Sequence, residues 1–387
     1  MKLREWVAVG VLAAAACGCG SDDDQVDIQA TTYNAGLAVG FVDYAPQRSS
    51  VTVNALAALP TKILCVQEFW DADDVGKLKA ATANSLPHTI FPAPQQEFVS
   101  GEAQCTTADL APLEACVESS CACTPNEQLA NCTLANCLPQ FLALPPKCSG
   151  CLQANVGLVA ALGLDRIIEE CTATQTAKYA YDGSFGTGLL TKYEILEQEE
   201  VVMDSHTNRR GLIYARLKTE VGDLHTICTH LTAVFRDIPF PEAAGSWAEE
   251  QAAQIDELIA FVNAKAGSGG KVLVLGDMNT GPAGKTYSAE VPANYAKFAA
   301  AGLADAYIRD GNEPCTFCGT NPLVGEGTPS VVIDHILTRG LTASAHRIME
   351  STVNVSVTTP ACGGNPGKTE TVLTAYSDHY GLQATIK

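Results

Sequence analysis

An α/β fold, α+β in the finer classification, is predicted by two features of this 387-residue chain. Segments with strand-like and helix-like patterns alternate from residue 26 to the C-terminus. Two apolar runs of strand length, Lys271–Leu275 and Ser330–Ile333, are typical of strands that are buried on both faces. Since 47% of the residues are hydrophobic and only 17% are charged, the chain is globular rather than disordered.

Five further strand-like segments come before these apolar runs in the chain, at Val26–Tyr33, Lys62–Gln67, Gly188–Thr191, Gly211–Lys218 and Asp223–Cys228. Pro241–Ala266 has helical spacing with acidic residues near its start, and the glycines at 267–270 end it. A final strand is expected after Ser377-Asp-His, and no internal repeat is visible.

Residues 1–18 are predicted to be an export signal with a lipid anchor. Lys2 and Arg4 precede the apolar run Trp6–Ala16, which is too short to span a bilayer as a helix. The small residues that lead to Cys17 and Cys19 resemble a bacterial lipoprotein signal, in which one of these cysteines is lipidated. An ordinary signal peptide cut before Cys17 is the alternative.

Residues 19–25 would form a solvated tether between this anchor and a main domain spanning residues 26–387. We therefore expect an exported protein, lipid-anchored to the bacterial membrane at its periplasmic or cell-surface face. The chain contains 16 cysteines, which also indicates an oxidising compartment.

A Cys-rich segment, residues 101–174, is predicted to be an insertion between two core strands. It holds nine of the cysteines, and its apolar residues recur at helical spacing, which indicates short helices joined by disulfides. The pairs Cys116/Cys121 and Cys132/Cys137 share one spacing, so two antiparallel helices with two cross-bridges would satisfy them. With nine cysteines, one must pair outside the segment or stay free.

Two Cys-x-x-Cys pairs allow a different interpretation. Cys148 with Cys151 and Cys315 with Cys318 have the spacing of zinc ligands. Because the chain is expected to be exported, disulfides are the preferred interpretation and a zinc protein is the alternative.

Polar residues stand at the ends of the expected strands, where they would gather at one rim of a sheet. The set combines carboxylates, carboxamides and two histidines, which suits an oxygen-liganded cation such as Mg²⁺ together with acid–base chemistry. Its members are Asn34, Glu68, His230, Asp277, Asn279, Asp334, Asp378 and His379.

Seven motifs carry a resemblance to the endonuclease/exonuclease/phosphatase superfamily, which includes pancreatic-type deoxyribonucleases, abasic-site endonucleases and neutral sphingomyelinases. They occur in the family's order from residue 26 to 387, apart from the Cys-rich segment. The resemblance implies a four-layer α/β/β/α sandwich of two mixed sheets. The motifs are Thr32-Tyr-Asn, Val66-Gln-Glu, Gly186-Thr-Gly-Leu-Leu-Thr-Lys-Tyr, Thr229-His-Leu, Gly276-Asp-Met-Asn, Ile333-Asp-His-Ile and Ser377-Asp-His-Tyr.

The same resemblance implies a metal site for Mg²⁺ or Mn²⁺. Glu68 would be the main ligand, assisted by Asn34, with Asp378 near the metal. Arg210 and Tyr181 are candidates for binding the substrate phosphate.

It also implies the catalytic roles. His379, oriented by Asp334, would be the general base or the phosphate-activating histidine. Asp277 and Asn279 would position the attacking water and the scissile phosphate. Asp277 and His379 could exchange roles. His230 would stabilise phosphoryl oxygens or assist the leaving group. His335 and Met278 depart from the family pattern and are interpreted as packing substitutions.

The net charge of −19 disfavours a basic nucleic-acid clamp. The predicted function is an exported, Mg²⁺-dependent phosphodiesterase that binds a nucleic acid or a phospholipid headgroup, with the nuclease-like activity preferred. A sphingomyelinase- or phospholipase C-like enzyme and a non-catalytic surface binding module are the alternatives. Protein partners are not predicted.

Overall fold

The computed structural model describes residues 27–236, 238–242, 244–359, 361–362 and 366–387. The predicted signal, the tether and the lipidation at Cys17 or Cys19 lie outside these residues. Within the described part of the chain, no helix has the length and apolar character needed to cross a membrane.

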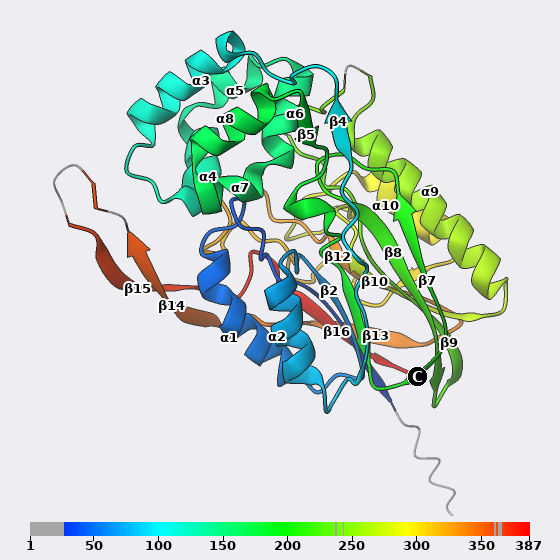
Figure 1. The fold of residues 1–387 in the computed structure, drawn as a ribbon. Coiled ribbons are helices and arrows are strands. Elements are labelled where there is room, and N and C mark those ends of the chain that lie inside the picture. The colour runs from blue at the N-terminus through cyan, green and yellow to red at the C-terminus, as the bar shows by residue number, and fades with distance from the viewer. Residues whose placement is uncertain (1–26, 237, 243, 360, 363–365) are drawn as a thin grey trace, which may run out of the picture.

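The described residues form two six-stranded mixed sheets (Figure 1). In the first sheet, ordered β13-β16-β1-β2-β6-β3, only β1 and β2 are parallel neighbours. In the second, ordered β11-β12-β10-β9-β8-β7, only β9 and β10 are parallel. The strands are β1 (Ile28–Asn34), β2 (Ile63–Gln67), β3 (His88–Ile90), β6 (Gly188–Thr191), β7 (Glu194–Met203), β8 (Arg210–Thr219), β9 (Gly222–His230), β10 (Lys271–Asp277), β11 (Ala304–Asp305), β12 (Asp334–Arg339), β13 (Ala343–Ile348) and β16 (Gly381–Ile386).

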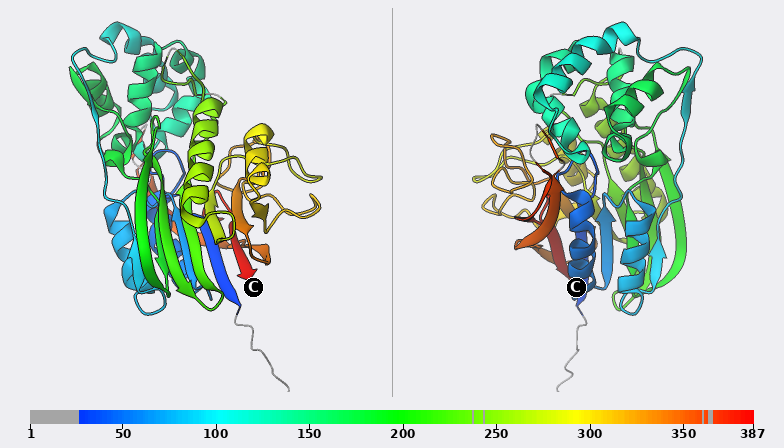
Figure 2. Two further views of the ribbon diagram at one scale, coloured as in Figure 1. Left: turned by 90° about the vertical axis from the view of Figure 1, so that its right-hand side faces the viewer. Right: turned by 60° about the vertical axis from the view of Figure 1, so that its left-hand side comes forward.

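Helices cover the outer face of each sheet (Figure 2). Helices α1 (Ala45–Ala57) and α2 (Ala72–Thr82) pack on the first sheet, and α9 (Trp247–Ala266) and α10 (Pro292–Ala300) pack on the second. A third apolar core, including Cys65, Leu189, Ile213 and Leu275, fills the space between the sheets. The four-layer α/β/β/α sandwich is therefore confirmed.

The Cys-rich segment forms a bundle of short helices above one end of the sandwich (Figure 1). It enters and leaves through the ribbon of β4 (Phe98–Ser100) and β5 (Gln175–Ala177), between β3 and β6, which pair in the first sheet. The bundle has its own core of buried apolar residues and half-cystines. Its helices are α3 (Thr107–Ser120), η1 (Asn126–Gln128), α4 (Leu129–Asn136), α5 (Leu138–Leu142), α6 (Pro146–Ala154), α7 (Val156–Leu162) and α8 (Leu164–Thr172).

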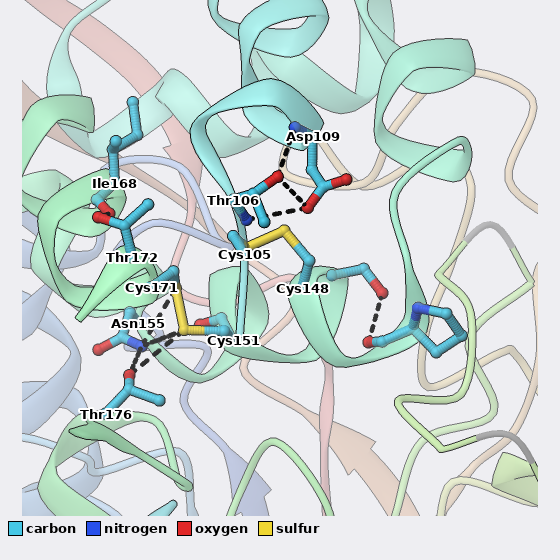
Figure 3. Close-up of a disulfide and its surroundings, with 12 residues drawn as sticks. Cys105, Thr106, Asp109, Cys148, Cys151, Asn155, Ile168, Cys171, Thr172 and Thr176 are labelled. Carbon is cyan, nitrogen blue, oxygen red and sulfur yellow. Dashed lines mark hydrogen bonds between the residues drawn. A yellow bond between two sulfur atoms is a disulfide. The ribbon is translucent and has the colours of Figure 1, made fainter. Parts of the chain in front are cut away.

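Disulfides hold this bundle together. Cys116–Cys137 and Cys121–Cys132 form the two predicted cross-bridges between the antiparallel helices α3 and α4. Figure 3 shows two further bridges, Cys105–Cys148 and Cys151–Cys171. The ninth cysteine, Cys123, pairs outside the segment with Cys362, next to the hairpin of β14 (Thr352–Thr359) and β15 (Lys368–Ala375).

The zinc interpretation is wrong for both Cys-x-x-Cys pairs. Cys148 and Cys151 belong to two different disulfides of the bundle, and Cys315 is bonded to Cys318. A cysteine engaged in a disulfide has no thiolate left to offer a metal.

Two expected elements differ from the structure. The helix predicted from Pro241 begins only at Trp247, because the side chain of Ser246 caps it by accepting a hydrogen bond from the backbone of Glu249. Residues 330–333 are not a strand: Val331 makes only isolated bridges, and β12 begins at Asp334. The apolar residues Val331, Val332 and Ile333 are therefore buried without belonging to a strand.

One disulfide crosses the sandwich itself. Cys65 of β2 is bonded to Cys228 of β9, and both residues are fully buried between the sheets. We predict that the C65A/C228A variant loses about 2–5 kcal/mol of unfolding free energy in urea denaturation, since the bridge closes a long loop. C315A/C318A is the control, because that bridge spans three residues and stabilises less. An equal loss in both variants would contradict this prediction.

Candidate active site

The polar residues singled out in the sequence come together at one end of the sandwich. Seven of them line a cleft of about 630 Å³, namely Glu68, Arg210, His230, Asp277, Asn279, Asp378 and His379. Asn34 and Asp334 lie fully buried behind it, in hydrogen-bond contact with the lining residues.

Strand direction explains why these residues meet. The parallel strands β9 and β10 end at the register partners His230 and Asp277. Strand β12 runs antiparallel to β10, so its first residue, Asp334, is paired with Asp277. Because an antiparallel strand starts where its neighbour ends, Asp334 belongs to the cluster as the start of a strand, not as the residue after one.

His379 and Asp334 form a buried pair. Nδ1 of His379 lies 2.9 Å from Oδ2 of Asp334, and its Nε2 lies 3.8 Å from Oδ2 of Asp277. Burial alone would lower the pKa of His379, but the carboxylates of Asp334, Asp277 and Asp378 raise that pKa well above its ordinary value. The surrounding carboxylates therefore favour the imidazolium form of His379 in the metal-free protein.

Asp277 occupies the centre of the cluster. Its Oδ2 accepts a hydrogen bond of 3.0 Å from the amide of Asn34, and its Oδ1 accepts one of 2.9 Å from the backbone of Asn279. Burial and the neighbouring charge of Asp334 raise the pKa of Asp277 to about 7. A carboxyl group with such a pKa is suited to accept a proton near neutral pH.

His230 differs from His379 in charge. Its Nε2 lies 3.4 Å from Oδ2 of Asp277 and 3.2 Å from the amide nitrogen of Asn279. Burial, followed by the positive charges of Arg210 and His379, lowers the pKa of His230 well below its ordinary value. The two histidines of the site are thus one imidazolium and one neutral imidazole.

Glu68 and its neighbours fit a divalent cation. Oε1 of Glu68 accepts from Asn34 at 3.1 Å, whereas Oε2 is buried without a partner among the described residues. Burial and the nearby charge of Asp378 raise the pKa of Glu68. The neighbouring carboxylates of Glu68 and Asp378, with one Glu68 oxygen unused, suit a hard cation. Its positive charge would offset the cost of burying the Glu68 carboxylate and the repulsion between the two carboxylates.

The side-chain NH₂ group of Asn34 donates hydrogen bonds to Glu68 and Asp277, and its side-chain oxygen accepts one from the backbone N–H of Gly36 at 3.0 Å. It would therefore serve as a metal ligand only with the amide turned over. Asp277, Asp334 and His379 also lie within 4.8 Å of one another. That trio is less suited to a cation, since its histidine is charged and bonded to Asp334.

A buried arginine fixes the loops that carry these ligands. Arg48 of α1 donates to the carbonyls of Ala35 and Tyr376, at 3.1 and 2.7 Å, and also to that of Gly36. Gly36 has a left-handed backbone (φ +55), and a Cβ there would stand 2.3 Å from Oδ1 of Asp378. The loop after β1 and the turn before β16 are thus locked together beside the metal residues.

Two site residues have unusual backbone angles. Glu68 (φ 60) and Asn279 (φ 50) both adopt the left-handed region that side chains other than glycine rarely occupy. Asn279 is held by hydrogen bonds from its amide to Leu231 and from Gln251 to its own carbonyl. Such conformations persist where surrounding contacts determine them, which is common at functional sites.

The two candidates for phosphate binding have different positions. Arg210 lines the cleft, with its Nη1 unpartnered among the described residues and its guanidinium 5.9 Å from the ring of Trp70. Tyr181 is not among the residues that line the cleft; it stacks on Trp70 and donates its hydroxyl to the carbonyl of Val39. Tyr181 therefore supports the wall of the cleft and does not enter it.

Sequence reasoning missed Trp70 and the role of His335. Trp70 lies in the cleft wall, and its position two residues after Glu68 was the available signal. Met278 is a fully buried core residue, as interpreted. His335 is more than packing, because it bridges Asp305 (2.6 Å) and the carbonyl of Thr280 (2.8 Å) beneath the site.

Comparison with known proteins gives the family of the chain. Residues 31–379 match the profile of the Endonuclease/Exonuclease/phosphatase family, so the chain belongs to this family of phosphoester hydrolases. No match is found among curated proteins.

Two solved structures illustrate the likeness in fold. Sphingomyelinase C from Streptomyces griseocarneus is 20% identical, with a TM-score of 0.53 over 93% of this chain and 99% of that one. A beta toxin variant from Staphylococcus aureus with bound magnesium ions is 15% identical, with a TM-score of 0.54 over 93% of this chain and 100% of that one.

The charge state of His379 can be measured directly. In metal-free protein we expect its ring to stay protonated above pH 6.5 in an NMR titration, because Asp334 stabilises the imidazolium. Asp334→Asn should lower the pKa of His379. Asp305→Asn is the matched control: it should lower the raised pKa of His335, a buried histidine outside the cleft, without affecting His379. A neutral His379 at pH 7 in the wild type would refute this assignment.

Proposed function

We propose that the protein is a divalent-metal-dependent phosphodiesterase. The observation that carries this proposal is the buried cluster at the base of the cleft, in which the Asp334–His379 pair meets Asp277 beside Glu68, whose second oxygen is unpartnered. A phosphodiester needs charge neutralisation, an attacking water and a proton donor for the departing alkoxide, and this cluster offers a group for each.

Glu68, Asp378 and Asn34 would hold Mg²⁺ or Mn²⁺, which when bound neutralises phosphate oxygens and polarises the ester. Arg210 binds a non-bridging oxygen. Asp277 accepts the proton of the attacking water as the new P–O bond forms, in line with its pKa of about 7.

The charged His379 gives a proton to the alkoxide as the old P–O bond breaks, and Asp334 keeps its ring oriented. His230 and Asn279 border the same space and position the phosphoryl oxygens. The direction of these pKa shifts supports the assignment of Asp277 as the base and His379 as the acid, out of the two arrangements that the family resemblance allows.

The cleft favours a single phosphodiester attached to apolar groups over a polynucleotide. Arg210 is the one arginine or lysine of the described cleft that is not paired with a carboxylate, since Arg236 is bonded to Glu290. Nucleic-acid binding uses several phosphate contacts. The walls instead contain aromatic and aliphatic side chains, among them Phe41, Phe235 and Phe317. An amphiphilic phosphodiester, such as a phospholipid, is thus the preferred substrate, and lipid anchoring after export would bring the cleft near it.

Metal dependence tests the proposed mechanism. EDTA should abolish hydrolysis of a chromogenic phosphodiester, and Mg²⁺ or Mn²⁺ should restore it. Glu68→Gln should lose activity by about two orders of magnitude or more and bind Mg²⁺ more weakly in calorimetry, because a neutral amide holds a dication poorly. Glu97→Gln, an exposed glutamate outside the cleft, is the control. Undiminished turnover in EDTA would overturn the mechanism.

Substrate preference tests the interpretation of the cleft. Purified enzyme with Mg²⁺ should hydrolyse phosphocholine lipids in vesicles faster than plasmid DNA, RNA or a phosphomonoester. Arg210→Met should depress hydrolysis of every phosphodiester, whereas Arg209→Met should not, because Arg209 is bonded to Glu97 and Tyr179 away from the cleft. Preferred cleavage of nucleic acid would reverse the substrate assignment and support the nuclease-like prediction.

A further inference from the structure

The Cys-rich bundle touches both loops that form the upper wall of the cleft. Asn131 of α4 donates to the carbonyl of Phe41 at 3.2 Å and to Asp43 at 3.0 Å, in the loop after β1. Gln153 of α6 donates to the carbonyl of Pro239, in the loop after β9, and accepts from Thr207. The bundle therefore meets the core where the cleft opens.

A cavity of about 80 Å³ lies at this junction. Helices α3, α4, α6 and α8 contribute side chains such as Leu113, Leu134, Leu152 and Ile167, and the core contributes Phe41. Phe41 also lines the catalytic cleft. One aromatic ring thus stands between the cavity and the site of hydrolysis.

The chemistry of the cavity is apolar. Its fourteen lining residues include two with polar side chains, Thr133 and Gln153. The hydroxyl of Thr133 donates to the carbonyl of Leu129 at 2.8 Å, and the amide of Gln153 is used by Pro239 and Thr207. Because both polar side chains among the described lining residues are engaged elsewhere, the cavity suits hydrocarbon better than water or a polar ligand.

We infer that the Cys-rich bundle supplies a binding site for the end of one hydrocarbon chain of the substrate, entered past Phe41. This inference rests on the proposed phosphodiesterase function. The cavity has about half the roughly 150 Å³ of an engineered cavity that takes up benzene, so it accepts the end of an unbranched chain and not a ring or two chains. The disulfides of the bundle would then keep the walls of this cavity in place, because the segment has only a small apolar core of its own.

Ala130→Leu tests the inference, because Ala130 lines the cavity and the added carbons would fill it. Ala135→Leu is the matched control, on the same helix α4 but exposed and outside the cavity. Xenon, which enters small apolar cavities, should give a bound ¹²⁹Xe NMR shift with the wild type and A135L and should lose it with A130L.

Kinetics test whether the cavity serves the substrate. For monomeric alkyl phosphocholines of increasing chain length, kcat/KM of the wild type and A135L should rise by about fourfold per added methylene over the two or three that enter, from about 0.8 kcal/mol per buried CH₂. A130L should flatten this rise, so that its preference for long over short chains falls by roughly 15- to 60-fold.

A chain-free chromogenic phosphodiester separates the two proposals. All three proteins should hydrolyse it equally. If they do, and A130L keeps the chain-length dependence or the wild type has none, the chain site is overturned while the phosphodiesterase stands. If none hydrolyses any phosphodiester, the proposed function falls and the chain site falls with it as a substrate site.

Discussion

The packing of the two sheets against each other is the constraint on which the site depends. Asn34 and Glu68 come from the parallel pair β1–β2 of the first sheet, whereas His230 and Asp277 come from the parallel pair β9–β10 of the second. Neither sheet alone contains both the metal residues and the proton-accepting carboxylate. The apolar core between the sheets and the Cys65–Cys228 bridge fix the distance between these two halves.

Burial gives the cluster its chemical character. The same exclusion of water that raises the pKa of Glu68 and of Asp277 lowers that of His230. The pKa of His379, which is surrounded by three aspartates, is raised against this effect. Ordinary side chains thus acquire pKa values shifted in different directions, as the proposed roles of base, acid and metal ligand require.

The Cys-rich bundle shows how a family fold acquires a new surface. It is inserted between β3 and β6, which still pair as neighbours, so the sheet is undisturbed. Five disulfides involve its cysteines, and one of them ties it to the region of the β14–β15 hairpin. The bundle contacts the loops around Phe41 and Pro239, which belong to the wall of the cleft and not to the buried polar cluster.

The sequence by itself determined the α/β class, through the alternation of apolar patterns, and a set of candidate site residues at strand ends. The order of the motifs added the four-layer sandwich through the family resemblance, and the equal spacing of cysteines suggested the two bridges between α3 and α4 that the structure contains. The tertiary structure alone decided that Cys65 meets Cys228, that Asp334 begins a strand, and that Tyr181 stays behind Trp70. It also decided which histidine is charged. These outcomes depend on sheet register and on burial, which join residues from 45 to 163 positions apart and leave no periodic signal in the chain.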